Sequence, residues 1–225
     1  MGSVPDYSDY RLTLGCLYCG GEKTTRDHAP SKVLLDTPLP ADLPVVGACQ
    51  PCNEGFSQDE EYLACLLDCA ISGTTEPDKL RRSNVARKLR EQPALRARIE
   101  KSRLEADGYI TFSVETGRIE NVVKKLAQGH ILYELSEVFR DEPSSIWFKP
   151  LHTLHLSERE AFETISLPPI WPEMGCRMMT RLATGNPGWQ VIQPHRYRYA
   201  TIFGGPTVAR IVLSEYLACE VAWDD

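Results

Sequence analysis

Two Cys-X-X-Cys pairs constrain the fold of this chain more than any other feature of its sequence. Cys16 pairs with Cys19, and Cys49 pairs with Cys52. Each pair can form a tight turn that presents two sulfur atoms to one ion, and two pairs supply the four thiolates of a tetrahedral zinc site. A disulfide framework is the alternative, but a chain of 225 residues with eight cysteines is too long to need disulfides to hold its core together. We therefore expect a structural zinc ion bound by these four cysteines.

Three residues between and directly after the two cysteine pairs carry a different chemistry. Asp27 and His28 place a carboxylate and an imidazole side by side between the pairs, and Asn53 follows the last cysteine directly. A surface pair at Asp27 and His28 and a helix cap at Asn53 form the plain structural interpretation. Capping explains Asn53 alone, however, and not the coincidence of all three residues beside a zinc knuckle.

With these residues, the stretch from 16 to about 70 resembles the HNH endonuclease superfamily, the ββα-metal nucleases built on a treble clef. The resemblance implies that Asp27 and Asn53 bind a catalytic Mg²⁺ or Mn²⁺ ion and that His28 is the general base that activates water. A hard cation with two oxygen ligands keeps room for phosphate oxygens. Neighbouring strand residues point to opposite faces, so Asp27 and His28 need irregular backbone to act on one phosphate. The sequence departs from the family at the middle asparagine, whose position falls on Pro44.

Charge is distributed unevenly along the chain. The formal net charge is -6, yet residues 79 to 103 contain ten lysines and arginines and only two acids. Such a segment is typical of a phosphate-binding surface, although a solvated helix face has the same composition. We expect nucleic-acid contacts at Lys32, Arg81, Arg82, Arg87 and Lys88.

The pattern of apolar residues predicts an α+β protein in three parts. These are an HNH-like treble-clef domain (1–73), a basic helical linker (74–106) and an α+β domain of unassigned role (107–225). Ser57 and Glu60 form the pattern of a capping box at a helix start, and Pro93 separates two basic helices. Further along, the sequence predicts a turn at Asp107-Gly108, a strand at 109–114, helical spacing from 119 to 126, a strand at 146–148, a helix at 157–165, β-rich runs at 177–183, 189–203 and 207–223, and a hairpin turn at 204–206.

The remaining features bound the setting of the protein. No run of 18 apolar residues and no apolar leader is present, which predicts a cytoplasmic protein without a membrane span. Four further cysteines are expected to be buried thiols: Cys65, Cys69, Cys176 and Cys219. Residues 107–225 are expected to supply specificity, a homo-oligomer contact or a surface for a regulatory protein.

Two functions follow from these observations. The leading expectation is a metal-dependent HNH-type endonuclease that hydrolyses phosphodiester bonds, with DNA as its substrate, zinc in a structural role and Mg²⁺ or Mn²⁺ in a catalytic one. The alternative is a non-catalytic zinc-binding adaptor that binds nucleic acid or protein.

Overall fold

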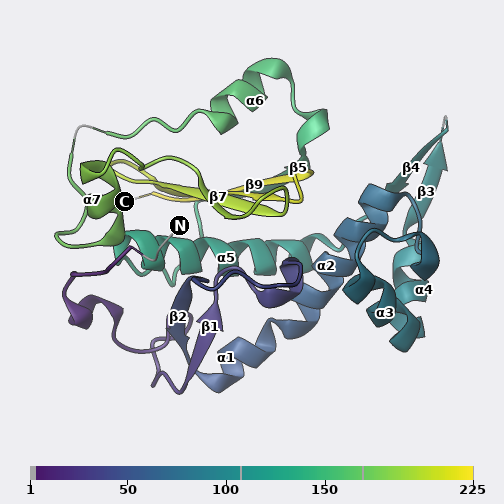
Figure 1. The fold of residues 1–225 in the computed structure, drawn as a ribbon, viewed down its shortest axis with the longest axis horizontal. Coiled ribbons are helices and arrows are strands. Elements are labelled where there is room, and N and C mark those ends of the chain that lie inside the picture. The colour runs from purple at the N-terminus through teal and green to yellow at the C-terminus, as the bar shows by residue number, and fades with distance from the viewer. Residues whose placement is uncertain (1–3, 107, 169, 225) are drawn as a thin grey trace. The chain divides into compact units, whose positions relative to one another are not determined.

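The computed structural model describes residues 4–106, 108–168 and 170–224, and it is a mixed α+β protein (Figure 1). The chain divides into two compact units, a larger one of residues 1–55 and 123–225 and a smaller one of residues 56–122. None of the described helices is long and apolar enough to cross a membrane. In chain order the elements are η1 (Tyr10–Thr13), β1 (Thr25–His28), η2 (Lys32–Leu34), β2 (Val45–Ala48), α1 (Gln50–Gly55), α2 (Ser57–Ser72), η3 (Pro77–Lys79), α3 (Ser83–Glu91), α4 (Pro93–Lys101), β3 (Arg103–Ala106), β4 (Tyr109–Phe112), α5 (Thr116–Leu135), β5 (Ser145–Pro150), η4 (Leu151–Thr153), α6 (Leu156–Glu163), α7 (Arg177–Ala183), β6 (Gln190–Gln193), β7 (Tyr197–Ile202), β8 (Thr207–Leu213) and β9 (Leu217–Trp223).

The larger unit is built on a five-stranded antiparallel sheet with the strand order β5-β9-β8-β7-β6. β8 and β9 carry mostly β-branched and small apolar residues, which suit a sheet that is covered by other elements. Figure 1 shows the second half of α5 along one face of this sheet and α6 over the other. Phe162 of α6 is buried there against Val212 and Ala218.

Helix α5 lies between this sheet and the small β1-β2 hairpin of the same unit (Figure 1). Lys125, Gly129 and Leu132 recur at helical spacing and contact the hairpin region. His130 and Glu134, one turn apart, contact the sheet instead. Two stripes of one helix therefore hold together the two β structures of the larger unit.

The contact of α5 with the sheet is unusually polar for a fully buried layer. His130 stacks on the Tyr199 ring with centroids 3.7 Å apart, and its Nε2 lies 2.7 Å from the Tyr197 hydroxyl. Burial lowers the pKa of His130 to about 3, so the imidazole is neutral. Glu134 accepts hydrogen bonds from the Tyr199 hydroxyl and from both ends of the Arg181 guanidinium. The buried carboxylate is thus fully paired, as a buried charge must be.

The smaller unit is helical apart from one hairpin. α2 ends at Gly73, which adopts the left-handed conformation that favours glycine. Pro93 stands at the first position of α4, where its missing N–H costs nothing. β3 and β4 pair antiparallel in register from Arg103 with Phe112 to Ala106 with Tyr109.

Several sequence expectations are confirmed. The break at Pro93, the helix containing residues 119–126, the strand at 146–148, the short helix near 157–165 and the turn at 204–206 are all present. Cys65, Cys69, Cys176 and Cys219 are buried thiols. The expected turn residue Asp107 lies outside the described residues, while the flanking strands form a hairpin.

Other expectations are wrong. Residues 177–183 form helix α7, because Arg, Met, Leu and Ala favour helix and Met178 supplies the buried contact. Ser57 does not cap α2: α1 runs almost directly into it, Phe56 is already in helical conformation, and its carbonyl takes the N–H groups of Asp59 and Glu60. The expected linker 74–106 includes strand β3. The other two β-rich runs, 189–203 and 207–223, are confirmed, and each forms a hairpin, β6-β7 and β8-β9.

Gly129 provides a test of how closely α5 approaches the hairpin. A Cβ added at Gly129 would lie 2.7 Å from the Cβ of Ala29, which has no rotamer with which to move away. Gly129→Ala should therefore destabilise the protein by about 1–3 kcal/mol, although alanine is ordinarily the better helix former by about 1 kcal/mol. Gly117→Ala in the same helix meets nothing within 4 Å and should be neutral or stabilising. Urea unfolding measures both, and a stabilised Gly129→Ala protein would contradict this packing.

Candidate metal centre and catalytic residues

The four cysteines of the two Cys-X-X-Cys pairs converge on one point. Their sulfur atoms all lie within 4.8 Å of one another, and Sγ of Cys19 and Sγ of Cys49 are 3.7 Å apart. Tetrahedral coordination with Zn–S bonds of about 2.3 Å requires sulfurs about 3.8 Å apart. The cluster is therefore compatible with a structural zinc ion, as expected from the spacing.

The backbone explains why both pairs reach the same ion. After Cys19 the chain turns back at Gly20, which has a φ of 77°, and the N–H of Cys16 donates to the carbonyl of Gly21. The other pair begins at the end of β2 and enters α1, where the N–H of Gln50 donates to the Thr24 hydroxyl beside β1. With four thiolates around it, a zinc ion would have no open position for water and would serve structure alone.

Removing the metal tests this centre. Cys49→Ser should lower the zinc content and the thermal midpoint, because the binding free energy of a structural ion contributes to folding. Metal analysis and circular dichroism of the variant and of chelator-treated wild-type protein measure the effect. Cys219→Ser is the matched control, since this buried cysteine lies outside the cluster. Native protein without zinc, or equal zinc in both variants, would contradict the assignment.

His28 is the most available of the expected catalytic side chains. It is half-buried on β1, and its backbone continues the regular pairing as the partner of Val45. Neither ring nitrogen has a hydrogen-bond partner within residues 4–106, 108–168 and 170–224. Burial lowers the pKa of His28, and the nearby Lys32 lowers it further while Asp27 opposes the change. The imidazole is therefore neutral near pH 7 and has a free lone pair.

Asn53 turns its side chain toward strand β1. Its Nδ2 lies 3.2 Å from the Thr25 hydroxyl oxygen and 3.4 Å from the Arg26 carbonyl oxygen. The Thr25 hydroxyl donates to the carbonyl of Ala48, so both of these neighbours can only accept from Asn53. The Oδ1 atom of Asn53 therefore points away from them, with no partner in the part of the chain that the structure describes.

Asp27 has a different environment from the one expected of a metal ligand. Its side chain is 6% exposed, and both carboxylate oxygens lie 3.0 Å from Nζ of Lys125, which is 1% exposed. The Tyr18 hydroxyl donates to Oδ2 at 2.7 Å, and Lys125 also donates to the Ser31 hydroxyl. Asp27 is thus one half of a buried, hydrogen-bonded ion pair.

The expected pair of cation ligands does not fit a divalent ion in this arrangement. Lys125 already neutralises Asp27, and a second cation at the same oxygens would meet its buried ammonium group. β1 also lacks the irregularity that would turn Asp27 and His28 to one side, since both residues stay in register with β2. Among the described interactions none joins Asp27 to Asn53.

A double-mutant cycle tests the ion pair. Lys125→Met should cost about 3–5 kcal/mol of unfolding free energy, because it leaves the Asp27 carboxylate buried without its counter-charge. Adding Asp27→Asn to that variant should recover part of the loss, since no charge then remains. Urea unfolding of both single variants and the double variant gives the coupling. Single-variant losses that add within about 0.5 kcal/mol would show that the two residues do not interact.

The residues expected to bind nucleic acid differ from one another in their exposure and in their partners. Lys32 is exposed and close enough to His28 to affect its pKa. Arg81 and Arg87 are exposed, Lys88 forms an ion pair with Glu61, and Arg82 is buried with its backbone N–H bonded to Asp68. The smaller unit as a whole carries 11 basic and 12 acidic residues, so the acids around the basic segment offset its charge.

Sequence reasoning missed the partners of Asp27. Lys125 stands 98 positions away, yet one signal was present: it interrupts an apolar helical stripe that includes Val122, Val123 and Leu126. A lysine at such a position needs a buried counter-charge.

No protein-family model, curated protein or solved structure matches this chain.

Proposed function

We propose that this protein is an HNH-type nuclease that hydrolyses phosphodiester bonds in nucleic acid, with His28 as the general base. The observation that carries the proposal is the unpartnered imidazole of His28 on a strand fixed by the cysteine cluster and by Asn53. Among the residues that the structure describes, no hydrogen bond uses the ring nitrogens of this half-buried histidine. A general base needs this availability.

In the proposed reaction, His28 takes a proton from water as the water oxygen bonds to phosphorus. The bond from phosphorus to the 3′ oxygen breaks, and that oxygen takes a proton from solvent. The products carry a 5′-phosphate and a 3′-hydroxyl, which the resemblance to HNH nucleases also implies. Lys32, exposed beside His28, is positioned to attract the phosphate.

The residues expected to hold a catalytic cation have separate roles in this proposal. Asn53 offers Oδ1 as an open oxygen beside β1, while its amide nitrogen fastens α1 to the strand. Asp27 positions the hairpin through Lys125 and does not contact substrate. The proposed reaction uses no cation bound by Asp27, because the carboxylate of Asp27 is already paired with Lys125.

The rival function is a zinc-binding adaptor without catalysis. The specific observation in its favour is the same Asp27–Lys125 pair, since it removes the only carboxylate of the expected catalytic set. The adaptor and the nuclease differ in one respect that can be measured: only a nuclease depends on His28 for turnover.

His28→Ala is the decisive variant. It should fold, keep its zinc and slow cleavage by about 10² to 10⁴, the usual contribution of a general base. His152→Ala is the matched control, because His152 is an exposed histidine of the same unit. Nicking of plasmid DNA and cleavage of labelled RNA, each with and without Mg²⁺ or Mn²⁺, measure the rates. If wild-type protein cuts nothing that the His28→Ala protein leaves intact, the adaptor replaces the nuclease.

A further inference from the structure

The smaller unit contains a groove of about 740 Å³, the volume of a typical ligand site. One side is the loop that follows α2, with Thr74, Thr75 and Glu76, and the other side is α4 with the end of α3. Leu89 and Ala97 supply apolar surface within it. The groove lies in one compact unit, so its geometry depends on that unit alone.

Three arginines line the groove, and they are not held equally. The guanidinium of Arg96 has no hydrogen-bond or ion-pair partner within the described ranges 4–106, 108–168 and 170–224. Arg90 pairs with Asp78, whose side chain is 88% exposed, and Arg103 pairs with Glu105, which is 61% exposed. Ion pairs this exposed contribute little, about 0–1 kcal/mol, so an incoming anion can replace the acidic partners.

The other polar groups of the groove are compatible with an anion. Thr74 Oγ1 accepts the N–H of Glu76, which leaves its hydroxyl proton to donate to a ligand. The two acids in the lining have partners: Glu76 pairs with Lys79 at 2.8 Å, and Glu100 accepts the Thr75 hydroxyl. The pKa of Glu76 is lowered, mainly by Lys79 and to a smaller extent by Arg96.

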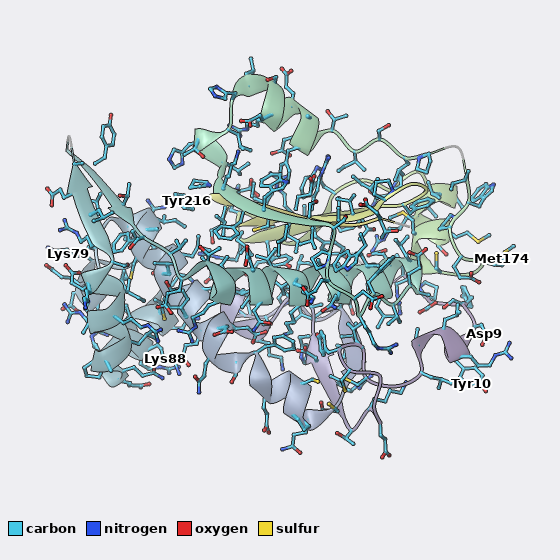
Figure 2. The ribbon with its side chains drawn as sticks, turned by 180° about the vertical axis from the view of Figure 1, so that it is seen from behind. Asp9, Tyr10, Lys79, Lys88, Met174 and Tyr216 are labelled. Atoms are coloured by element: carbon cyan, nitrogen blue, oxygen red, sulfur yellow. The ribbon has the colours of Figure 1, made fainter. Side chains whose placement is uncertain are left out.

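We propose that this groove binds backbone phosphates of a nucleic-acid strand through Arg90, Arg96 and Arg103. Guanidinium groups match phosphate oxygens with paired N–H donors, which makes three arginines around one groove well suited to successive phosphates. The inference deepens and rests on the proposed nuclease function, for which it supplies a substrate contact. The proposed contacts therefore differ from two that the sequence predicts, since Arg82 is buried and Lys88 pairs with Glu61. Figure 2 labels Lys79 and Lys88, which belong to the same unit.

Two variants of equal charge test the groove. Arg90→Gln/Arg96→Gln removes two charges from the groove, and Arg81→Gln/Arg87→Gln removes two charges from exposed positions outside it. Both are made in the full chain with His28→Ala, so that a substrate is bound without being cut. Fluorescence anisotropy then measures the affinity for labelled 20-nucleotide single-stranded DNA, duplex DNA and RNA between 50 and 200 mM salt.

The groove variant should bind at least about tenfold more weakly, and on duplex DNA the slope of log affinity against log salt should fall by about 1.8, or 0.9 for each lost phosphate contact. The control variant should lose less than about threefold. Arg96→Lys, which keeps the charge but loses the paired donors, should fall between wild type and Arg96→Gln. Equal losses in groove and control variants would overturn the proposal, and so would absence of binding to all three probes.

The outcome is separable from that of the proposed function. Groove-dependent binding without any His28-dependent cleavage would leave the groove intact and favour the adaptor. Cleavage that depends on His28 but not on the groove arginines would retain the nuclease and reject the groove.

Discussion

The buried ion pair between Asp27 and Lys125 is the interaction on which the larger unit depends. It joins the β1-β2 hairpin to α5, and α5 in turn carries the polar contacts to the five-stranded sheet through His130 and Glu134. A buried pair of this kind adds little net stability by itself, yet losing either partner leaves an uncompensated charge. The pair therefore fixes which face of α5 meets the hairpin. Gly129 allows the close approach that the pair requires.

The same pair also separates the side chains of Asp27 and His28 onto opposite faces of the hairpin. Because Asp27 faces Lys125 and the two residues are regular strand neighbours, His28 lies on the other side of β1. The cysteine cluster then fixes the ends of β1 and β2 to α1, which brings Asn53 against the backbone of Arg26. The three residues thus differ in their contacts: Asp27 pairs with Lys125, Asn53 bonds to β1 through its amide nitrogen, and the ring nitrogens of His28 have no partner among the described residues, as the proposed general base requires.

Local patterns in the sequence were sufficient for the features that depend on local physics. The Cys-X-X-Cys spacing predicts the cluster that is compatible with zinc, and the break at Pro93 follows from backbone constraints. The errors have a different cause. Residues 177–183 read as β-rich because two methionines and a leucine carry no strong periodicity over seven residues. Lys125, which neutralises Asp27, lies 98 positions away along the chain, and no spacing rule connects residues this far apart.

A crystal soaked with Mn²⁺ and measured at the manganese and zinc absorption edges tests the central claim most directly, namely that Lys125 and not a divalent ion occupies the cationic position at Asp27. The account predicts zinc at the four thiolates, Nζ of Lys125 within hydrogen-bonding distance of Asp27, and no manganese at that carboxylate. A manganese ion bound by both Asp27 and Asn53, with the Lys125 side chain displaced, would contradict it.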